Sequence, residues 1–397
     1  MNGKSTTAKP VYTMRQLSGY FLRLGTTGFG GPVALVGYMH RDLVEGRGWI
    51  TEDEYREGLA LAQMAPGPLA AQLAIYLGFV HYRYRGAALA GLAFVLPSFV
   101  MVVLLGIVYK LFGGLRWIGW IFYGVGAAVI GVIAISAYKL TLKTVGKLDG
   151  PEIRKRWLLW VLWLGGISAT VVSGTEPIWW LVGAGLLYMA VKAPPRWMRR
   201  GGTLKAGGWL VATGFWNFQP DALGRIGWFF FKAGAFVFGS GLAIVPFLHG
   251  GVVSEYHWLS EAQFLDAVAV AMITPGPVVI TVGFIGYLVA GFPGAVVAAL
   301  ATFLPCYLFT VLPAPYFKRW AANGSVRAFV DGITAAVVGS LTGAVLLMAA
   351  RSVVDWPTAA VAAGSCVVLL FIKGVKETQV IGAGALVGVL LKLIALL

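Results

Sequence analysis

The sequence predicts an all-α polytopic membrane protein in which two homologous halves each contribute a set of membrane segments. Three observations predict this class: an apolar composition, a series of apolar stretches long enough to cross a bilayer, and an internal duplication. Of the 397 residues, 58% are hydrophobic and 12% are charged, and the mean hydropathy is +0.80. Soluble proteins carry about 25% charged residues. This chain therefore has too few charges to cover the surface of two or three soluble domains.

Apolar stretches of the length that a membrane helix needs, about 17–25 residues, occur in both halves of the chain. They lie at 86–109, 117–142, 157–173, 177–191, 294–313, 328–350, 356–372 and 378–397. Further apolar stretches that Gly and Pro interrupt lie at 17–39, 58–80, 226–248 and 264–291. A short stretch at 204–218 either crosses the membrane or lies at its interface. We expect about 12–13 membrane segments, with the interrupted ones forming broken or re-entrant helices.

The chain is duplicated. A shift of 209 residues aligns the halves without a gap from Phe21/Phe230 to Pro68/Pro277, and a shift of 208 extends the match further. Composition bias produces scattered Gly and Ala matches, but it does not keep other residue types in register. The matched positions include Gly25/Gly234, His40/His249, Trp49/Trp258, Glu52/Glu261 and the sequence Pro66-Gly67-Pro68, which recurs as Pro275-Gly276-Pro277. We place a first repeat at 14–192, a basic linker that includes the short extra stretch at 193–222, and a second repeat at 223–397.

We interpret the formal net charge of +15 as an indication of membrane topology, that is, of which loops face which side of the membrane. The basic residues separate apolar stretches and do not form one stripe suited to nucleic acid. In the first half they concentrate in alternate loops, at Arg83 and Arg85 and again at 143–156. In the second half the counterpart loop at 289–293 has no charge, and the next one, at 318–327, is basic. Positive loops face the cytoplasm. The halves are therefore predicted to be inverted, with the N-terminus in the cytoplasm and the C-terminus in the periplasm.

The interrupted segments are candidates for an anion site. Thr51 with Glu54 fits a capping box, and Ser260 fits a helix start. The helices that follow must stop before Pro66 and Pro275. Helix N-termini inside a membrane favour anions, and such backbone survives only beside protein or water. The alternative is that Gly and Pro merely permit kinks and close packing. The candidate binding residues at the breaks are Gly30, Gly31, Pro32, Pro66, Gly67, Pro68, Gly239, Ser240, Gly241, Thr274, Pro275, Gly276 and Pro277.

Two cations and two amides extend this set of substrate-binding candidates. Arg23 and Lys232 occupy equivalent positions inside apolar segments, where a cation is costly unless it is paired. We expect them to neutralise part of an anion's charge, and the alternative is that they snorkel to the lipid headgroups. Gln63 and Gln72 flank the first Pro-Gly-Pro sequence and offer amide groups that hydrogen-bond an oxyanion.

Further matched pairs, His40/His249 and Glu57/Asp266, are candidates for carrying a coupled proton. The alternatives are a structural role for the histidines and a solvated helix start for the acids. The sequence has no phosphate-binding glycine loop of the ATPase type, no metal-ligand cluster and no Ser–His–Asp arrangement. We therefore expect no cofactor, no bound metal and no enzymatic activity.

These residues resemble the chromate ion transporter family in its fused two-domain form. The resemblance rests on Phe29-Gly30-Gly31-Pro32, on the stretch from His40 to Trp49, and on Ala65-Pro66-Gly67-Pro68, with second-half counterparts at 238–241 and 274–277. It covers nearly the whole chain. It implies efflux of chromate from the bacterial cytoplasm across the inner membrane in exchange for protons, by halves of opposite orientation. In the second half Ser240-Gly241 replaces Gly31-Pro32, so the two breaks need not share one geometry.

We therefore expect a secondary active transporter that exports a tetrahedral dianion such as chromate. Its partners are the oxyanion, protons and the lipid bilayer, with a homodimer left open and no nucleic acid. Sulfate has the same shape and charge, so exporters of other oxyanions remain an alternative. A passive anion channel is a second alternative, because the same breaks can line a pore. A membrane enzyme or flippase acting on lipid phosphate ranks last, since it should carry a catalytic carboxylate or histidine constellation.

Overall fold

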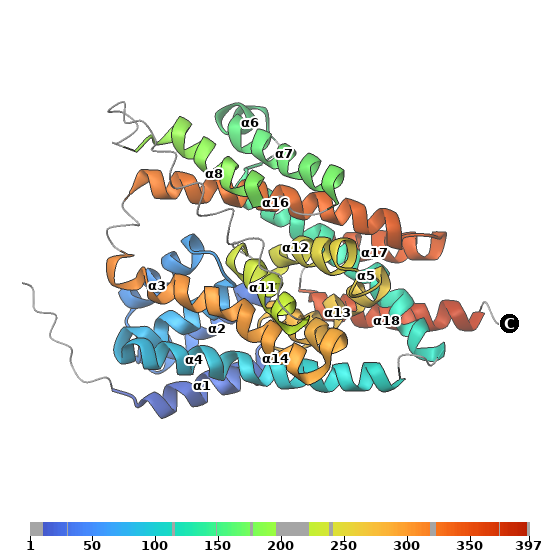
Figure 1. Cartoon of the computed structure of the whole chain (residues 1–397), viewed down its shortest axis with the longest axis horizontal. Helices are drawn as coiled ribbons and strands as arrows, with labels where there is room; N and C mark the ends of the chain where they lie inside the picture. The colour runs from blue at the N-terminus through green and yellow to red at the C-terminus, as the bar shows by residue number, and fades with distance from the viewer. Residues whose placement is uncertain are drawn as a thin grey trace, which may run out of the picture.

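The computed structural model describes residues 11–29, 31–112, 116–147, 149–174, 178–195, 222–237, 241–317, 323–372 and 374–394, and these residues form helices and no strand. In the first half the helices are α1 (Met14–Thr27), α2 (Gly31–Met39), the π-helix η1 (His40–Gly46), α3 (Glu52–Met64), α4 (Leu69–Phe112), α5 (Arg116–Thr144), α6 (Gly150–Lys155), α7 (Trp157–Ser173) and α8 (Ile178–Lys192). In the second half they are α11 (Ala222–Ala235), η3 (Gly241–Ile244), α12 (Val245–His249), η4 (Gly250–Glu255), α13 (Glu261–Ile273), η5 (Val278–Ile280), α14 (Thr281–Val311), η6 (Ala314–Tyr316), α16 (Gly324–Ser352), α17 (Trp356–Phe371) and α18 (Glu377–Ile394). Figure 1 shows them as one body, with the C-terminus at one end of its long axis.

Five described helical segments are long and apolar enough to cross a membrane: Leu69–Phe112, Gly119–Thr144, Val278–Tyr316, Gly324–Ser352 and Glu377–Ile394. Large apolar side chains on α4 and α14 face outward, among them Leu92 and Leu300, each more than half exposed. An apolar surface of this kind is favourable in contact with lipid tails and unfavourable in contact with water. The expected class, an all-helical multi-pass membrane protein, is confirmed. Residues 204–218 lie outside the described residues, so the count of 12–13 segments stays a prediction.

Each interrupted segment folds back on itself as a helical hairpin with its break at the turn. The Tyr20 hydroxyl in α1 donates to the Tyr38 carbonyl in α2 over 3.3 Å, and these residues lie equally far from the break near residue 29. In the second half the equivalent rings of Phe229 and Phe247 stack at 5.4 Å. Gly58 in α3 packs against the ring of Tyr76 in α4, on either side of Pro-Gly-Pro. Antiparallel arms of this kind have the form that re-entrant hairpins would take, and their depth in the membrane stays a prediction.

Helices α4 and α14 each contain a sharp bend at which the chain turns back on itself. Non-helical backbone occurs at Arg83, with φ 52°, and at Gly291, with φ 63°. After these bends Gly86 returns to lie against Gly78, and Gly294 returns to lie against Gly286, close enough that a methyl group on either partner would strike backbone. Each element therefore contributes a short arm to a helical hairpin and continues into a longer apolar arm, within a segment long enough to cross a membrane.

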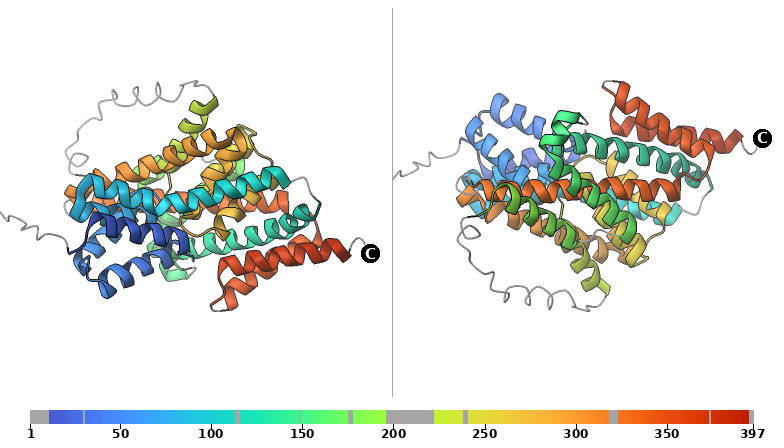
Figure 2. Two further views of the ribbon diagram at one scale, coloured as in Figure 1. Left: turned by 90° about the horizontal axis from the view of Figure 1, so that it is seen from below. Right: turned by 90° about the horizontal axis from the view of Figure 1, so that it is seen from above.

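Two of the long helices, α5 and α16, pack chiefly against helices of the other half. Helix α16 of the second half packs against both α7 and α8 of the first, and α5 of the first half packs against α17 and α18 of the second. Figures 1 and 2 show both arrangements from three directions. Small residues make them possible, because the backbones can approach closely there. Gly124 in α5 touches the backbone of Gly384 and Gly388, and Gly332, its repeat equivalent in α16, touches that of Ala184 and Gly185.

Candidate functional site

The four breaks meet at the interface of the two repeats, and we call their described residues (28, 29 and 31; 65–68; 237 and 241; 274–277) the hairpin tips. The Gly67 N–H donates to the Val237 carbonyl over 2.6 Å, and the Gly276 N–H donates to the Gly28 carbonyl over 3.0 Å. Gly67 and Gly276 are repeat equivalents, and so are Gly28 and Val237. Reciprocal contacts of this kind are the signature of a two-fold relation between two copies. Each Pro-Gly-Pro turn is therefore held by the first break of the opposite repeat.

The central glycines of the two Pro-Gly-Pro turns have backbone angles that side chains disfavour, with φ +143° at Gly67 and +100° at Gly276. Neighbouring side chains also occupy the space that a Cβ atom would take, from Gln72 at Gly67 and from Ser98 at Gly276. Ser98 is fully buried and its hydroxyl donates to the Pro275 carbonyl over 2.8 Å. The turns are thus shaped by glycine and braced by polar side chains from α4.

The remaining candidates at the tips have varied surroundings. Gln72 is fully buried and its amide N–H donates to the Pro66 carbonyl over 2.8 Å, so it braces the first turn from inside. Gln63 is exposed. The Thr274 hydroxyl, at the C-cap of α13, donates to the Val270 carbonyl. Gly31, with φ +72°, begins α2 ahead of Pro32, and Gly241 begins η3. Gly30, Gly239 and Ser240 lie outside the described residues.

Both candidate histidines pair with a glutamate, and the two pairs are repeat equivalents. His40 Nε2 lies 2.8 Å from Glu52 Oε2, and His249 Nε2 lies 2.8 Å from Glu261 Oε1. Both glutamates sit in the first turn of a hairpin arm, α3 or α13. The first pair is partly exposed, whereas the His249 side chain is 2% exposed. Each pair therefore links the end of one hairpin to the start of the next, away from the tips.

The candidate acids differ between the repeats. Asp266 is buried in α13, and it accepts a hydrogen bond of 2.7 Å from the hydroxyl of Tyr109 in α4. Glu57, its equivalent in α3, is only partly buried. The second repeat therefore buries a carboxyl group that the first leaves near the surface.

The two candidate cations lie on equivalent hairpin arms but in different surroundings. Lys232 in α11 is partly buried, with its ammonium 5.9 Å from the ring centre of Trp228. Arg23 in α1 is exposed, and it lines a cavity of about 610 Å³ between α1 and the α2–η1 segment. The cavity extends from Thr27 and Gly28, at a hairpin tip, to Arg47 beyond the end of η1.

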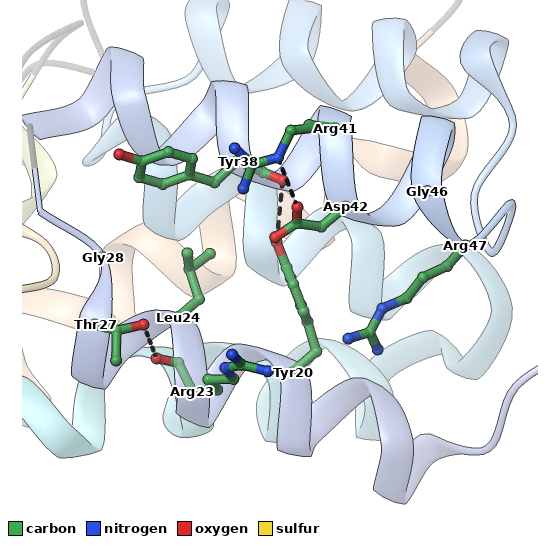
Figure 3. Close-up of a pocket in the computed structure, with 10 residues that line it drawn as sticks. All are labelled: Tyr20, Arg23, Leu24, Thr27, Gly28, Tyr38, Arg41, Asp42, Gly46 and Arg47. Atoms are coloured by element: carbon green, nitrogen blue, oxygen red, sulfur yellow. Dashed lines mark hydrogen bonds and ion pairs between the residues drawn. The ribbon is translucent and has the colours of Figure 1, made fainter.

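Polar side chains dominate this cavity, as Figure 3 shows. Arg41 Nε lies 2.9 Å from Asp42 Oδ1, and the Arg41 guanidinium lies 5.2 Å from the ring centre of Tyr38. The Arg47 guanidinium lies 4.5 Å from the ring centre of Trp49 and 5.3 Å from that of Tyr20. Among the described residues, no carboxylate comes within 4 Å of the guanidinium of Arg23 or Arg47.

Sequence reasoning identified Arg23 but missed the residues that complete this cavity, as well as the glutamates that pair with the histidines. The identity of Glu52 and Glu261 at matched positions was the available signal for those pairs. Ser98 carried no such signal, since its repeat equivalent is Cys306. Arg41 and Arg47 likewise have no basic counterparts in the second repeat, so only the hairpin fold brings them to Arg23.

A duplicated, all-helical membrane protein whose broken helical hairpins meet at their tips has the architecture of a membrane transporter. The comparison with known families gives the particular one: the chain belongs to the chromate transporter family, whose model matches residues 15–189 and 224–389. The expected family is confirmed, and it appears once in each half. Membership places the chain in a family of transporters.

Curated relatives support this membership. A chromate transport protein of Cupriavidus metallidurans is 60% identical over 386 residues, which cover 96% of this chain and 93% of that protein. A probable chromate transport protein of Synechococcus elongatus is 59% identical, over 71% of this chain and 70% of its own length. A chromate transport protein of Pseudomonas aeruginosa is 29% identical over 70% of this chain and 67% of its own length. No solved structure matches the chain.

Proposed function

We propose that this protein is a secondary active transporter that exports chromate from the cytoplasm across the bacterial inner membrane. The relatives named as chromate transport proteins support the substrate. The observation that carries the mechanism is the meeting of the four hairpin tips through two reciprocal hydrogen bonds. A single interface between two copies of one unit is the arrangement that alternating access by rocking requires.

In this mechanism the anion binds at the tips. The N–H groups of Gly67 and Gly276 then donate to the anion instead of to the carbonyls that they contact in this structure. Exchange of these bonds separates the repeats at the tips and lets them rock. Arg23 and Lys232, one and a half turns before the first tip of each repeat, offset the charge of the anion. A charge-assisted hydrogen bond contributes about 1.5–3 kcal/mol, so the loss of either cation should be measurable.

Replacing Arg23 or Lys232 with glutamine is expected to lower chromate uptake about tenfold or more while leaving folding intact. Uptake of radiolabelled chromate into inside-out vesicles with an acidic interior measures it. Arg85→Gln, which removes an exposed cation from the bend of α4, is the matched control and should transport normally. Wild-type rates in both cation variants would refute their assignment.

Proton antiport is proposed to use Asp266. A buried ionised carboxylate needs a partner, and Tyr109 supplies one hydrogen bond that serves either protonation state. Asp266→Asn is expected to abolish uptake driven by a pH gradient while leaving chromate–sulfate exchange within a few-fold of the wild type. Glu57→Gln, at the equivalent but more exposed position, is the control. Coupled uptake by Asp266→Asn would exclude this residue as the proton carrier.

The passive anion channel is the competing function. A channel would give a flux that does not saturate with chromate and does not follow an imposed pH gradient, and uptake by purified protein in liposomes distinguishes the two. The same liposomes, with sulfate and molybdate as competitors, define the substrate range.

The membrane orientation of the repeats is also part of the proposal. The alternating loop charges favour inverted repeats, and the two-fold contacts at the tips are compatible with an axis in the membrane plane. The N-terminus then lies in the cytoplasm and the C-terminus in the periplasm. A reporter enzyme that is active only in the periplasm, fused to the C-terminus, should be active, and an inactive fusion would reverse this assignment.

A further inference from the structure

We infer that the cavity between α1 and η1 is an anion-binding entrance, where Arg23, Arg41 and Arg47 bind a tetrahedral oxyanion before it reaches the hairpin tips. This inference rests on the proposed transport function, and it adds a site that the broken-helix pattern does not contain. Neither Arg41 nor Arg47 belongs to a matched pair of cations in the two repeats.

The charge of the cavity is the first argument. Three guanidinium groups and the carboxylate of Asp42 line it, a formal charge of +2. Asp42 is engaged with Arg41 and also accepts a hydrogen bond from the Tyr20 hydroxyl. Arg23 and Arg47 have no carboxylate within ion-pair distance among the described residues. A divalent anion would balance this charge.

The geometry of the arginines is the second argument. The Arg47 guanidinium lies near the rings of both Trp49 and Tyr20. Stacking on an aromatic ring uses the face of a guanidinium and leaves its N–H edges for another partner. Planar guanidinium groups bind tetrahedral oxyanions through paired hydrogen bonds. At about 610 Å³ the cavity has room for such an anion together with water, since one water molecule occupies about 30 Å³ in the liquid.

Comparison with the second repeat is the third argument. There the positions of Arg41 and Arg47 hold Gly250 and Tyr256. The equivalent space is filled by aromatic rings: Phe229 stacks on Phe247 at 5.4 Å and meets Tyr256 edge-on at 5.6 Å. The hairpin fold by itself therefore does not create a polar cavity. Among the described residues, aromatic rings stand in the second repeat where the first has its charged side chains, so the charged approach to the tips lies on one side of the two-fold arrangement.

The position of the cavity gives the direction of the path. Its lining passes from Arg47 through Arg23 to Thr27 and Gly28. The Gly28 carbonyl is the acceptor of the Gly276 N–H, one of the two bonds that join the repeats. An anion that moves along the cavity thus arrives at the contact that must open for transport.

Binding of radiolabelled sulfate, with chromate as competitor, tests the site without transport. The full-length protein is placed in discs of phosphatidylcholine at low ionic strength and measured by equilibrium dialysis. Arg41→Gln and Arg47→Gln are each expected to weaken binding about tenfold or more. Arg47→Lys keeps the charge and should lose less, and Arg85→Gln should bind as the wild type does. Equal binding by the wild type and by both glutamine variants would overturn the inference.

A lipid phosphate has the same tetrahedral oxyanion chemistry, so a second arm adds phosphatidylglycerol to the discs. Sulfate binding that persists supports an entrance for free anions. Sulfate binding that phosphatidylglycerol abolishes, with Arg47→Gln weakening the lipid's retention, would show a headgroup site and overturn the inference. Since Arg41 is exposed, Arg41→Gln keeps the test valid if Arg47→Gln unfolds. Arginine-dependent sulfate binding without chromate transport would refute the proposed function and leave the site standing.

Discussion

Replacing Gly276 with alanine is expected to abolish transport and to destabilise the protein by roughly 2–6 kcal/mol. The backbone at Gly276 has φ +100°, and holding a side chain there stores about 1–3 kcal/mol of strain. The new Cβ atom would also strike the Ser98 hydroxyl, which is fully buried, and overpacking adds about 1–3 kcal/mol. The protein can relieve both only by moving the Pro-Gly-Pro turn, which breaks the hydrogen bond to Gly28. Thermal unfolding in detergent and chromate uptake measure the two effects.

Matched glycine variants separate this explanation from a general effect of added volume. Gly67→Ala should be less severe, because its Cβ atom meets the end of the longer Gln72 side chain, which has more rotatable bonds and can shift at the cost of its hydrogen bond to Pro66. Gly183→Ala, in α8 with open space around it, should be neutral. Combining Gly276→Ala with Ser98→Ala should restore part of the stability, since the obstructing hydroxyl is gone. Equal effects at Gly276 and Gly183 would contradict the assigned geometry.

Neither repeat is expected to accumulate when it is expressed alone, whereas co-expression of residues 1–195 and 196–397 should restore protein and chromate transport. Helix α16 packs on α7 and α8, and α5 packs on α17 and α18, so each fragment alone loses the main partners of one of its long helices. In lipid these contacts depend on close approach at small residues, which no lipid tail can replace. Immunoblots of membranes and vesicle uptake give the measurements.

The co-expressed pair is its own control, because it contains the same chain break as the separate fragments. Gly332→Leu should prevent complementation, since Gly332 touches the backbone of α8, while Gly183→Ala should not. A first repeat that is stable and monomeric by itself would show that the contacts between α5 and the second half are dispensable.

Much of the architecture could be predicted from the sequence, because it depends on local chemistry. The duplication follows from residues in register, the helix starts at Thr51 and Ser260 from capping boxes that the structure contains, and the breaks from Pro-Gly-Pro. Each of these signals acts within a few residues along the chain. The repetition of the breaks was enough to predict that they serve one site, and the structure brings them into contact.

The pairing of each histidine with its glutamate could not be predicted from the local sequence. His40 and Glu52 lie twelve residues apart, and the π-helix between them sets how their side chains meet. Because the register of such a turn depends on what packs around it, the match of Glu52 with Glu261 signalled a role without giving the partner. Buried Ser98 is a stronger case, since its partner Pro275 lies in the other repeat.

The sequence by itself thus determined the membrane class, the two repeats and the positions of the four breaks, since composition and short-range backbone preferences decide these. Only the tertiary structure decided that α5 and α16 pack on helices of the opposite repeat. It also decided that Arg41 and Arg47 join Arg23 around one cavity. Those outcomes depend on which surfaces fit each other, and the fit is made by residues far apart in the chain. The two repeats share their breaks and differ in this cavity because the breaks need Gly and Pro in both copies, while the packing beside them accepts either charged or aromatic side chains.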